Sequence, residues 1–146
     1  MNPLPPVLGG WPDGLQAMLA VDVACEAQGL PLGLLELVRL HCSVLNSCFF
    51  CIAMHTEKTL NLGVAPTIVD DIVSRRSPSG LDEGGRTALA YAAALTLLDQ
   101  NDEATIAGTT SALRQHFRPK DVTVLTYAVA QINAWNRLAR ADPAST

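Results

Sequence analysis

Residues 36–55 read ELVRLHCSVLNSCFFCIAMH, and this stretch decides how the chain folds. Its first part belongs to a segment, residues 32–45, that is apolar nearly all round, which is typical of a buried helix. The dipeptide Asn46-Ser47 then provides residues that favour a turn and a helix N-cap. A second helix is therefore expected at about residues 48–62, and the two helices should follow each other across a tight turn.

Two cysteines and one histidine share a face of this second helix. Cys48 is expected in its first turn, Cys51 follows three residues later and His55 four residues after that. Free N–H groups and the macrodipole at a helix start favour a negative sulfur, and a nearby imidazole has the same effect. Because only the thiolate is a nucleophile, the pattern favours redox chemistry, with metal binding and a purely structural role as alternatives. Phe49 and Phe50 are expected to shield the site from water.

Glu36 stands among leucines and valine on a helix that ought to be buried. A buried carboxylate is costly unless it has a partner. In one interpretation Glu36 exchanges protons at the thiols and has a raised pKa. In the other it forms an ion pair with Arg39, three residues on, at an exposed edge. The residues alone leave both interpretations open.

The rest of the sequence predicts helices and no strands, because apolar residues recur at spacings of three and four. Residues 1–12, rich in proline and glycine, are predicted to form an extended arm, and residues 141–146 a frayed tail. The predicted fold is an all-α, single-domain bundle of about seven helices within residues 1–146, with the helical part at 13–140. The helices are expected at about 13–28, 32–45, 48–62, 65–74, 83–98, 103–117 and 119–140.

Composition excludes some functions and favours others. The net charge is −4, and no basic cluster occurs beyond Arg75-Arg76, which argues against nucleic-acid binding. The longest nearly uninterrupted apolar run, residues 88–98, is too short to cross a membrane. The first residues lack the basic and apolar parts of a secretory signal, so a cytoplasmic location is expected, where cysteines rest as thiols. With only 16% charged residues, the chain is expected to hide apolar surface in a homo-oligomer.

Residues 36–55 resemble the alkylhydroperoxidase D-like branch of the carboxymuconolactone decarboxylase superfamily. That branch has Glu, eleven residues, Cys-x-x-Cys, three residues and His, and this sequence matches each spacing. Residues 132–138 are similar to the last helix of the family, and residues 86–98 to its alanine-rich central helix. The resemblance covers most of residues 13–140. It implies an all-α fold that assembles into dimers, trimers or hexamers.

The resemblance also implies a role for each residue of the motif. Cys51 would be the more buried thiol that reacts with peroxide, and Cys48 the more accessible resolving thiol. His55 and Glu36 would form a proton relay, with Glu36 buried beside the cysteine helix. The implied activity is that of an antioxidant, thiol-dependent alkyl hydroperoxidase without cofactor or metal. Its partners would be a peroxide and an external dithiol reductant of the thioredoxin-like or lipoyl type.

One position departs from the family pattern, and two other functions stay open. Phe50 stands where the best-known full-length members have a second histidine, which predicts a weaker peroxidase or a different thiol substrate. The first alternative is a redox-sensing or metal-binding module without turnover. His41 and Cys42 could complete a zinc site in principle, but adjacent helical residues point about 100° apart. The second alternative is a decarboxylase-like or purely structural oligomer, which has no need for the cysteine pair.

Overall fold

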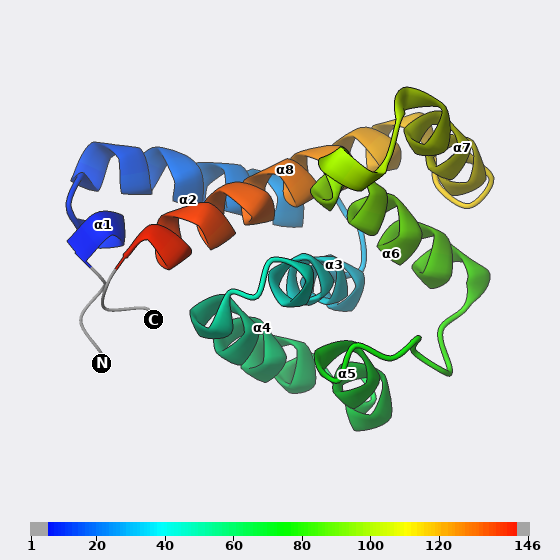
Figure 1. Cartoon of the computed structure of the whole chain (residues 1–146), viewed down its shortest axis with the longest axis horizontal. Helices are drawn as coiled ribbons and strands as arrows, with labels where there is room; N and C mark the ends of the chain where they lie inside the picture. Colours follow the sequence, from blue (N-terminus) through cyan, green and yellow to red (C-terminus); the bar gives the residue numbers. More distant parts are fainter. Residues whose placement is uncertain (1–5, 143–146) are drawn as a thin grey trace.

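The computed structural model describes residues 6–142, and all regular elements in this range are helices (Figure 1). This confirms the predicted all-α fold class. None of the helices within residues 6–142 is long and apolar enough to cross a membrane. The elements are α1 (Pro6–Gly9), α2 (Pro12–Glu26), α3 (Leu32–Leu45), α4 (Phe49–Asn61), α5 (Pro66–Val73), α6 (Glu83–Thr96), the 3-10 helix η1 (Leu98–Gln100), α7 (Glu103–Arg114) and α8 (Pro119–Ala141).

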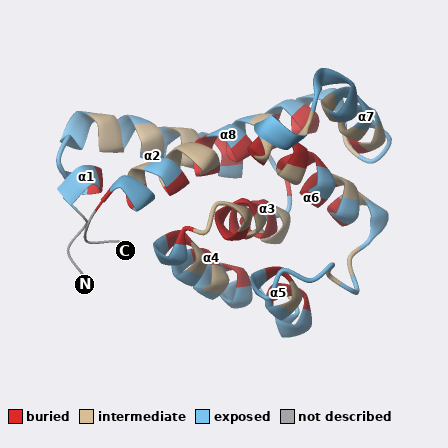
Figure 2. Ribbon diagram, viewed as in Figure 1, coloured by how far each residue is buried: buried red, intermediate tan, exposed pale blue. Residues whose placement is uncertain are grey.

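Helix α3 lies at the centre of the bundle. It contacts α4, α5, α6 and α8, and it is the most continuously buried helix in Figure 2. Its apolar residues on all sides account for this position, since each face of the helix meets another element. Helices α2 and α8 run along one side of α3, and α4 and α5 lie on the opposite side (Figure 1). This arrangement brings residues from α2, α3, α4 and α8 to a common site.

Helix boundaries follow local capping chemistry. The side chains of Asp82 and Asp102 act as N-caps by accepting hydrogen bonds from backbone N–H groups at 2.7 and 2.8 Å. Gly29 and Gly63 have φ values of 95° and 86° and follow the ends of α2 and α4, where this left-handed conformation favours glycine. The predicted helices are therefore confirmed, with shifts of a few residues at their ends.

The predicted extended arm is wrong at residues 6–9, which form the short helix α1. Pro6 occupies the first helical position. An N–H there has no partner within the helix, so proline, which lacks this N–H, is tolerated. The Val7 N–H donates to the carboxylate of Asp142, so α1 packs on the end of α8. Asp142 is fully buried, and the predicted frayed tail is therefore also wrong at its beginning. The remaining parts of the predicted arm and tail, residues 1–5 and 143–146, lie outside the described residues.

Candidate redox site

Cys48 and Cys51 form a disulfide at the N-terminus of α4. Cys48 is the N-cap residue, with extended backbone, and its sulfur lies 3.4 Å from the Cys51 N–H that donates to it. The Cα atoms are 5.3 Å apart. The helix thus begins at Phe49, one residue later than predicted, and the sulfurs lie at its positive end.

Burial does not distinguish the two cysteines. The exposed fraction is 1% for Cys48 and 2% for Cys51, so the implied greater access of Cys48 is wrong in this chain. The difference between them lies in their surroundings, because Cys51, unlike Cys48, lines the cavity that also contains His55. Phe50 lines the same cavity, whereas Phe49 is 76% exposed and does not line it, so the predicted shielding rests on Phe50.

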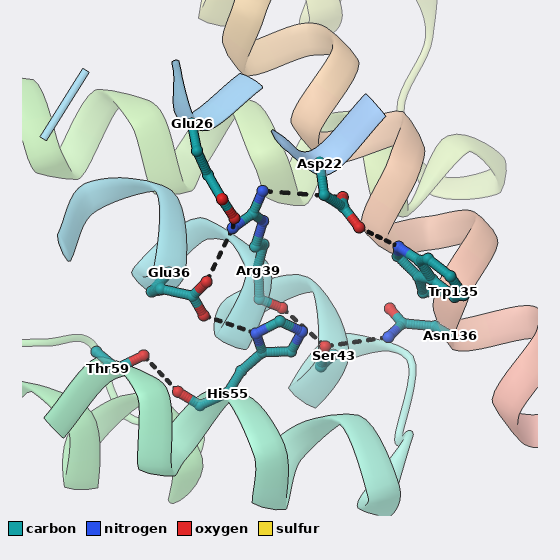
Figure 3. Close-up of polar contacts among 9 residues, drawn as sticks. All are labelled: Asp22, Glu26, Glu36, Arg39, Ser43, His55, Thr59, Trp135 and Asn136. Carbon is teal, nitrogen blue, oxygen red and sulfur yellow. Dashed lines mark hydrogen bonds and ion pairs between the residues drawn. The ribbon is translucent and has the colours of Figure 1, made fainter. Parts of the chain in front are cut away.

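The imidazole of His55 lies one helical turn beyond Cys51 and is held by Glu36. Its Nδ1 is 2.7 Å from Oε2 of Glu36, which comes from α3, and both side chains are buried (Figure 3). The other ring nitrogen points away from Glu36 (Figure 3). Because a carboxylate only accepts hydrogen bonds, Nδ1 carries a hydrogen, and Nε2 is the basic nitrogen of the neutral ring.

Arg39 is the second partner of Glu36. Its Nη1 donates to Oε1 of Glu36 at 2.8 Å, so the predicted ion pair with Arg39 is present, although it is buried and not at an exposed edge. Burial alone would raise the pKa of Glu36, but the hydrogen bonds and positive charge of His55 and Arg39 outweigh it and lower that pKa. The predicted raised pKa is therefore wrong. Glu36 stays a carboxylate near neutral pH and orients His55.

A wider charge network surrounds Arg39 and was not predicted from the sequence. Nη1 of Arg39 also donates to Glu26 at 2.9 Å, and Nη2 lies 3.8 Å from Asp22 (Figure 3). The indole of Trp135, on α8, donates to Asp22 at 2.8 Å. Burial raises the pKa of Asp22 even though Trp135 and Arg39 lower it. The one signal in the sequence was the spacing of two acids one turn apart on α2.

A cavity of about 370 Å³ lies beside Cys51 and His55. This volume is in the range of small-molecule sites. Charged groups on its wall include Arg39 and Lys58, and most of the remaining wall is apolar. The apolar side chains come mainly from α2, α4 and α8 and include Leu15, Leu19, Val23, Met54, Ile132 and Trp135.

The residues considered for zinc do not converge on the cysteine pair. Cys42 is fully buried, accepts a hydrogen bond from the Thr96 hydroxyl at 3.4 Å, and has its pKa raised to about 12 by burial. His41 lines a different cavity, between α3, α5 and α6. Within residues 6–142, no group of three or more His, Cys, Asp or Glu side chains is placed to hold a metal ion.

The lowered pKa of Glu36 should make stability depend on pH in the acid range. Its folded-state pKa lies below the unfolded value of about 4.3, so the stabilisation is complete above that value and is lost as pH falls through the folded pKa. Between pH 6 and 3, the free energy of unfolding in urea should therefore fall more steeply for the native protein than for Glu36→Gln. Equal slopes would show that folding does not favour the charged form.

The fold and the paired cysteines define an all-helical protein with a dithiol centre at a helix start. The chain belongs to the carboxymuconolactone decarboxylase family, whose sequence model matches residues 10–94, more than half of its length. Among curated proteins, the uncharacterized protein YdfG of Bacillus subtilis (strain 168) is 23% identical over 131 residues, which are 88% of this chain and 86% of YdfG.

Solved structures share the fold. A protein of unknown function from Agrobacterium tumefaciens, whose description suggests an AhpD antioxidant defence protein, has a TM-score of 0.84 at 24% identity and covers 92% of this chain and 91% of its own. An uncharacterized peroxidase-related protein from Ralstonia eutropha JMP134 with an AhpD core has a TM-score of 0.79 at 23% identity. The match covers 92% of this chain and 71% of the Ralstonia chain. Another uncharacterized peroxidase-related protein, from Silicibacter sp. TM1040, has a TM-score of 0.76 at 23% identity. The match covers 93% of this chain and 71% of the Silicibacter chain. The fold is thus AhpD-like, which confirms the resemblance.

Proposed function

We propose that this protein is a cysteine-based peroxidase, which reduces an organic hydroperoxide and is restored by an external dithiol. The observation that carries the proposal is the Cys48–Cys51 disulfide at the start of α4, beside the buried His55–Glu36 pair and a cavity. The names of the structural relatives, which refer to AhpD and to peroxidases, support it. A reducing cytoplasm, where dithiols keep cysteines reduced, suits this chemistry.

The cycle begins with the reduced cysteines. The Cys51 thiolate attacks the terminal oxygen of ROOH, the O–O bond breaks, and the leaving RO⁻ takes up a proton and departs as ROH. The sulfur, oxidised by two electrons, is then a sulfenic acid. The Cys48 thiolate attacks this sulfur, the S–S bond forms, and hydroxide leaves and is protonated to water. Thiol–disulfide exchange with a dithiol restores both thiols and oxidises the dithiol to its disulfide.

His55 is the proposed acid–base group of this cycle. Its Nε2 takes the proton from the Cys51 thiol and returns it to the leaving oxygen. Glu36 holds the opposite ring nitrogen in its protonated form and stabilises the imidazolium. Because its pKa is lowered, Glu36 acts here as a fixed carboxylate and leaves proton transfer to His55. Phe50 adds no second acid–base group, so the relay consists of His55 alone.

A homo-oligomer is part of the proposal. Several large apolar side chains are exposed on the single chain, which is the surface composition expected where subunits meet. Some of them, such as Val23 and Met54, also line the cavity beside Cys51. A neighbouring subunit would then reduce the access of water to the site.

The proposed function is tested by the stoichiometry of thiol oxidation. Reduced protein treated with one equivalent of tert-butyl hydroperoxide should lose two thiols per peroxide consumed, and peptide mapping should find the Cys48–Cys51 disulfide. Excess dihydrolipoamide should then regenerate both thiols and sustain further turnover. Peroxide that persists beside reduced thiols would refute the proposal. A disulfide that forms but is not reduced again by the dithiol would favour the redox-sensing alternative.

A further inference from the structure

The turn that carries Cys48 is a Schellman motif at the end of α3. The Ser47 N–H donates to the carbonyl of Val44, and the Cys48 N–H donates to the carbonyl of Ser43, each at 3.0 Å. The motif needs a left-handed residue after the C-cap, and Ser47 fills this place with a φ of 51°. Glycine is the usual residue there because a side chain is strained in this conformation.

Helix α5 ends in the same way, with Arg75 in the left-handed place. Its φ is 60°, and its N–H donates to the carbonyl of Ile72 at 3.0 Å. Between residues 6 and 142, Ser47 and Arg75 are the two non-glycine residues with positive φ. They contact each other, because Nη2 of Arg75 donates to Oγ of Ser47 at 2.9 Å and to the Val44 carbonyl at 2.8 Å.

Helix α8 holds the other residue of the turn, Asn46. Nη1 of Arg140 donates to the Asn46 carbonyl at 2.9 Å. The Asn46 amide donates to the side-chain oxygens of Asn133 and Asn136, each at 2.9 Å. The turn is therefore bound from two sides, at Ser47 by Arg75, which lies just after α5, and at Asn46 by α8.

We infer that Arg75 is a positioning residue for Cys48, an inference that rests on the proposed redox use of the cysteine pair. Cys48 is at once the last residue of the α3 motif and the N-cap of α4, so the turn determines where its sulfur lies. By holding Ser47 in its strained conformation, Arg75 keeps the Cys48 sulfur within bonding reach of Cys51. Such preorganisation raises the effective concentration of one thiol at the other and favours the disulfide.

The equilibrium between the dithiol and disulfide forms tests this role. In dithiothreitol redox buffers at pH 7, Arg75→Ala should lower the equilibrium constant for disulfide formation about tenfold, which corresponds to a reduction potential about 30 mV higher. Arg76→Ala is the matched control, since the Arg76 guanidinium pairs with Asp70 and Asp71 at the surface. This control should leave the constant unchanged within about twofold. A shift in Arg75→Ala no larger than in Arg76→Ala would overturn the inference.

A Ser47→Gly background separates positioning from a general loss of structure. Glycine adopts the left-handed conformation without strain, so the turn should persist without Arg75. In this background, Arg75→Ala should change the constant by less than about twofold. An equal shift in both backgrounds would refute positioning. If Arg75→Ala does not fold, Arg75→Lys, which loses the planar guanidinium, replaces it in the same comparison.

The redox measurement needs no peroxide, so it separates this inference from the proposed function. A shift that disappears in the Ser47→Gly background supports positioning even if the protein turns over no hydroperoxide. If hydroperoxide is turned over and Arg75→Ala leaves the redox constant unchanged, the positioning role fails and the proposed function stands.

Discussion

Replacing Cys51 with serine should slow hydroperoxide consumption by the reduced protein by at least about a thousandfold. Serine keeps nearly the same volume, but its hydroxyl does not ionise near neutral pH and is a far weaker nucleophile. Cys51, and not Cys48, is expected to react with the hydroperoxide because Cys51 lines the cavity of about 370 Å³ beside His55. The measurement is peroxide loss in a single turnover, with the protein in excess.

Cys48→Ser should have a different effect. The reaction of Cys51 with peroxide should proceed at close to the native rate. Without the Cys48 thiol, however, the sulfenic acid on Cys51 cannot form a disulfide and should be oxidised further to the sulfinic acid, which mass spectrometry detects. Cys25→Ser is the control, because burial raises the pKa of the Cys25 thiol and the residue lies outside the cavity wall. A full loss in Cys48→Ser together with activity in Cys51→Ser would reverse the two roles. Native rates in both variants would exclude the pair as the reactive centre.

The parts of the site that lie within one helix could be predicted from the sequence. The spacing of Cys48, Cys51 and His55 places them near one another through helix geometry alone, and the structure joins the first two by a disulfide. Asn46-Ser47 could be predicted as a turn, because these residues favour turns and caps. The strain at Ser47 could not be predicted, since its left-handed conformation is held by Arg75, 28 residues further along the chain.

Contacts between helices could be predicted less well. The family resemblance implied that Glu36 lies near His55. The residues alone left two roles open for Glu36, a proton relay or an ion pair. The direction of its pKa shift was predicted wrongly because the hydrogen bonds and charges of His55 and Arg39, both buried beside Glu36, outweigh the effect of burial on its carboxyl. Likewise, helix α1 depends on a hydrogen bond from Val7 to Asp142, at the other end of the described chain. No local pattern in the sequence contains that contact.

Arg39→Met should lower the free energy of unfolding by about 3 kcal/mol or more, the range found when one partner of a buried ion pair is removed. Arg39 is 4% exposed, and its guanidinium contacts Glu36 and Glu26 and lies 3.8 Å from Asp22. Methionine fills most of the same space, so the main change is the loss of positive charge. Glu36, the most buried of the three acids, would be left with His55 as its partner. Urea unfolding at pH 7 measures the effect.

The control for this prediction is Arg86→Met. Arg86 makes an exposed ion pair with Glu83 at 3.7 Å, and its replacement should change the free energy of unfolding by less than about 1 kcal/mol. Equal losses in the two variants would show that the Arg39 network adds nothing to stability. The pH dependence identifies the cause, because carboxylates left without Arg39 have raised pKa values and are neutralised by protons as pH falls. The deficit of Arg39→Met should therefore shrink toward pH 4, whereas a deficit that stays constant would indicate lost packing.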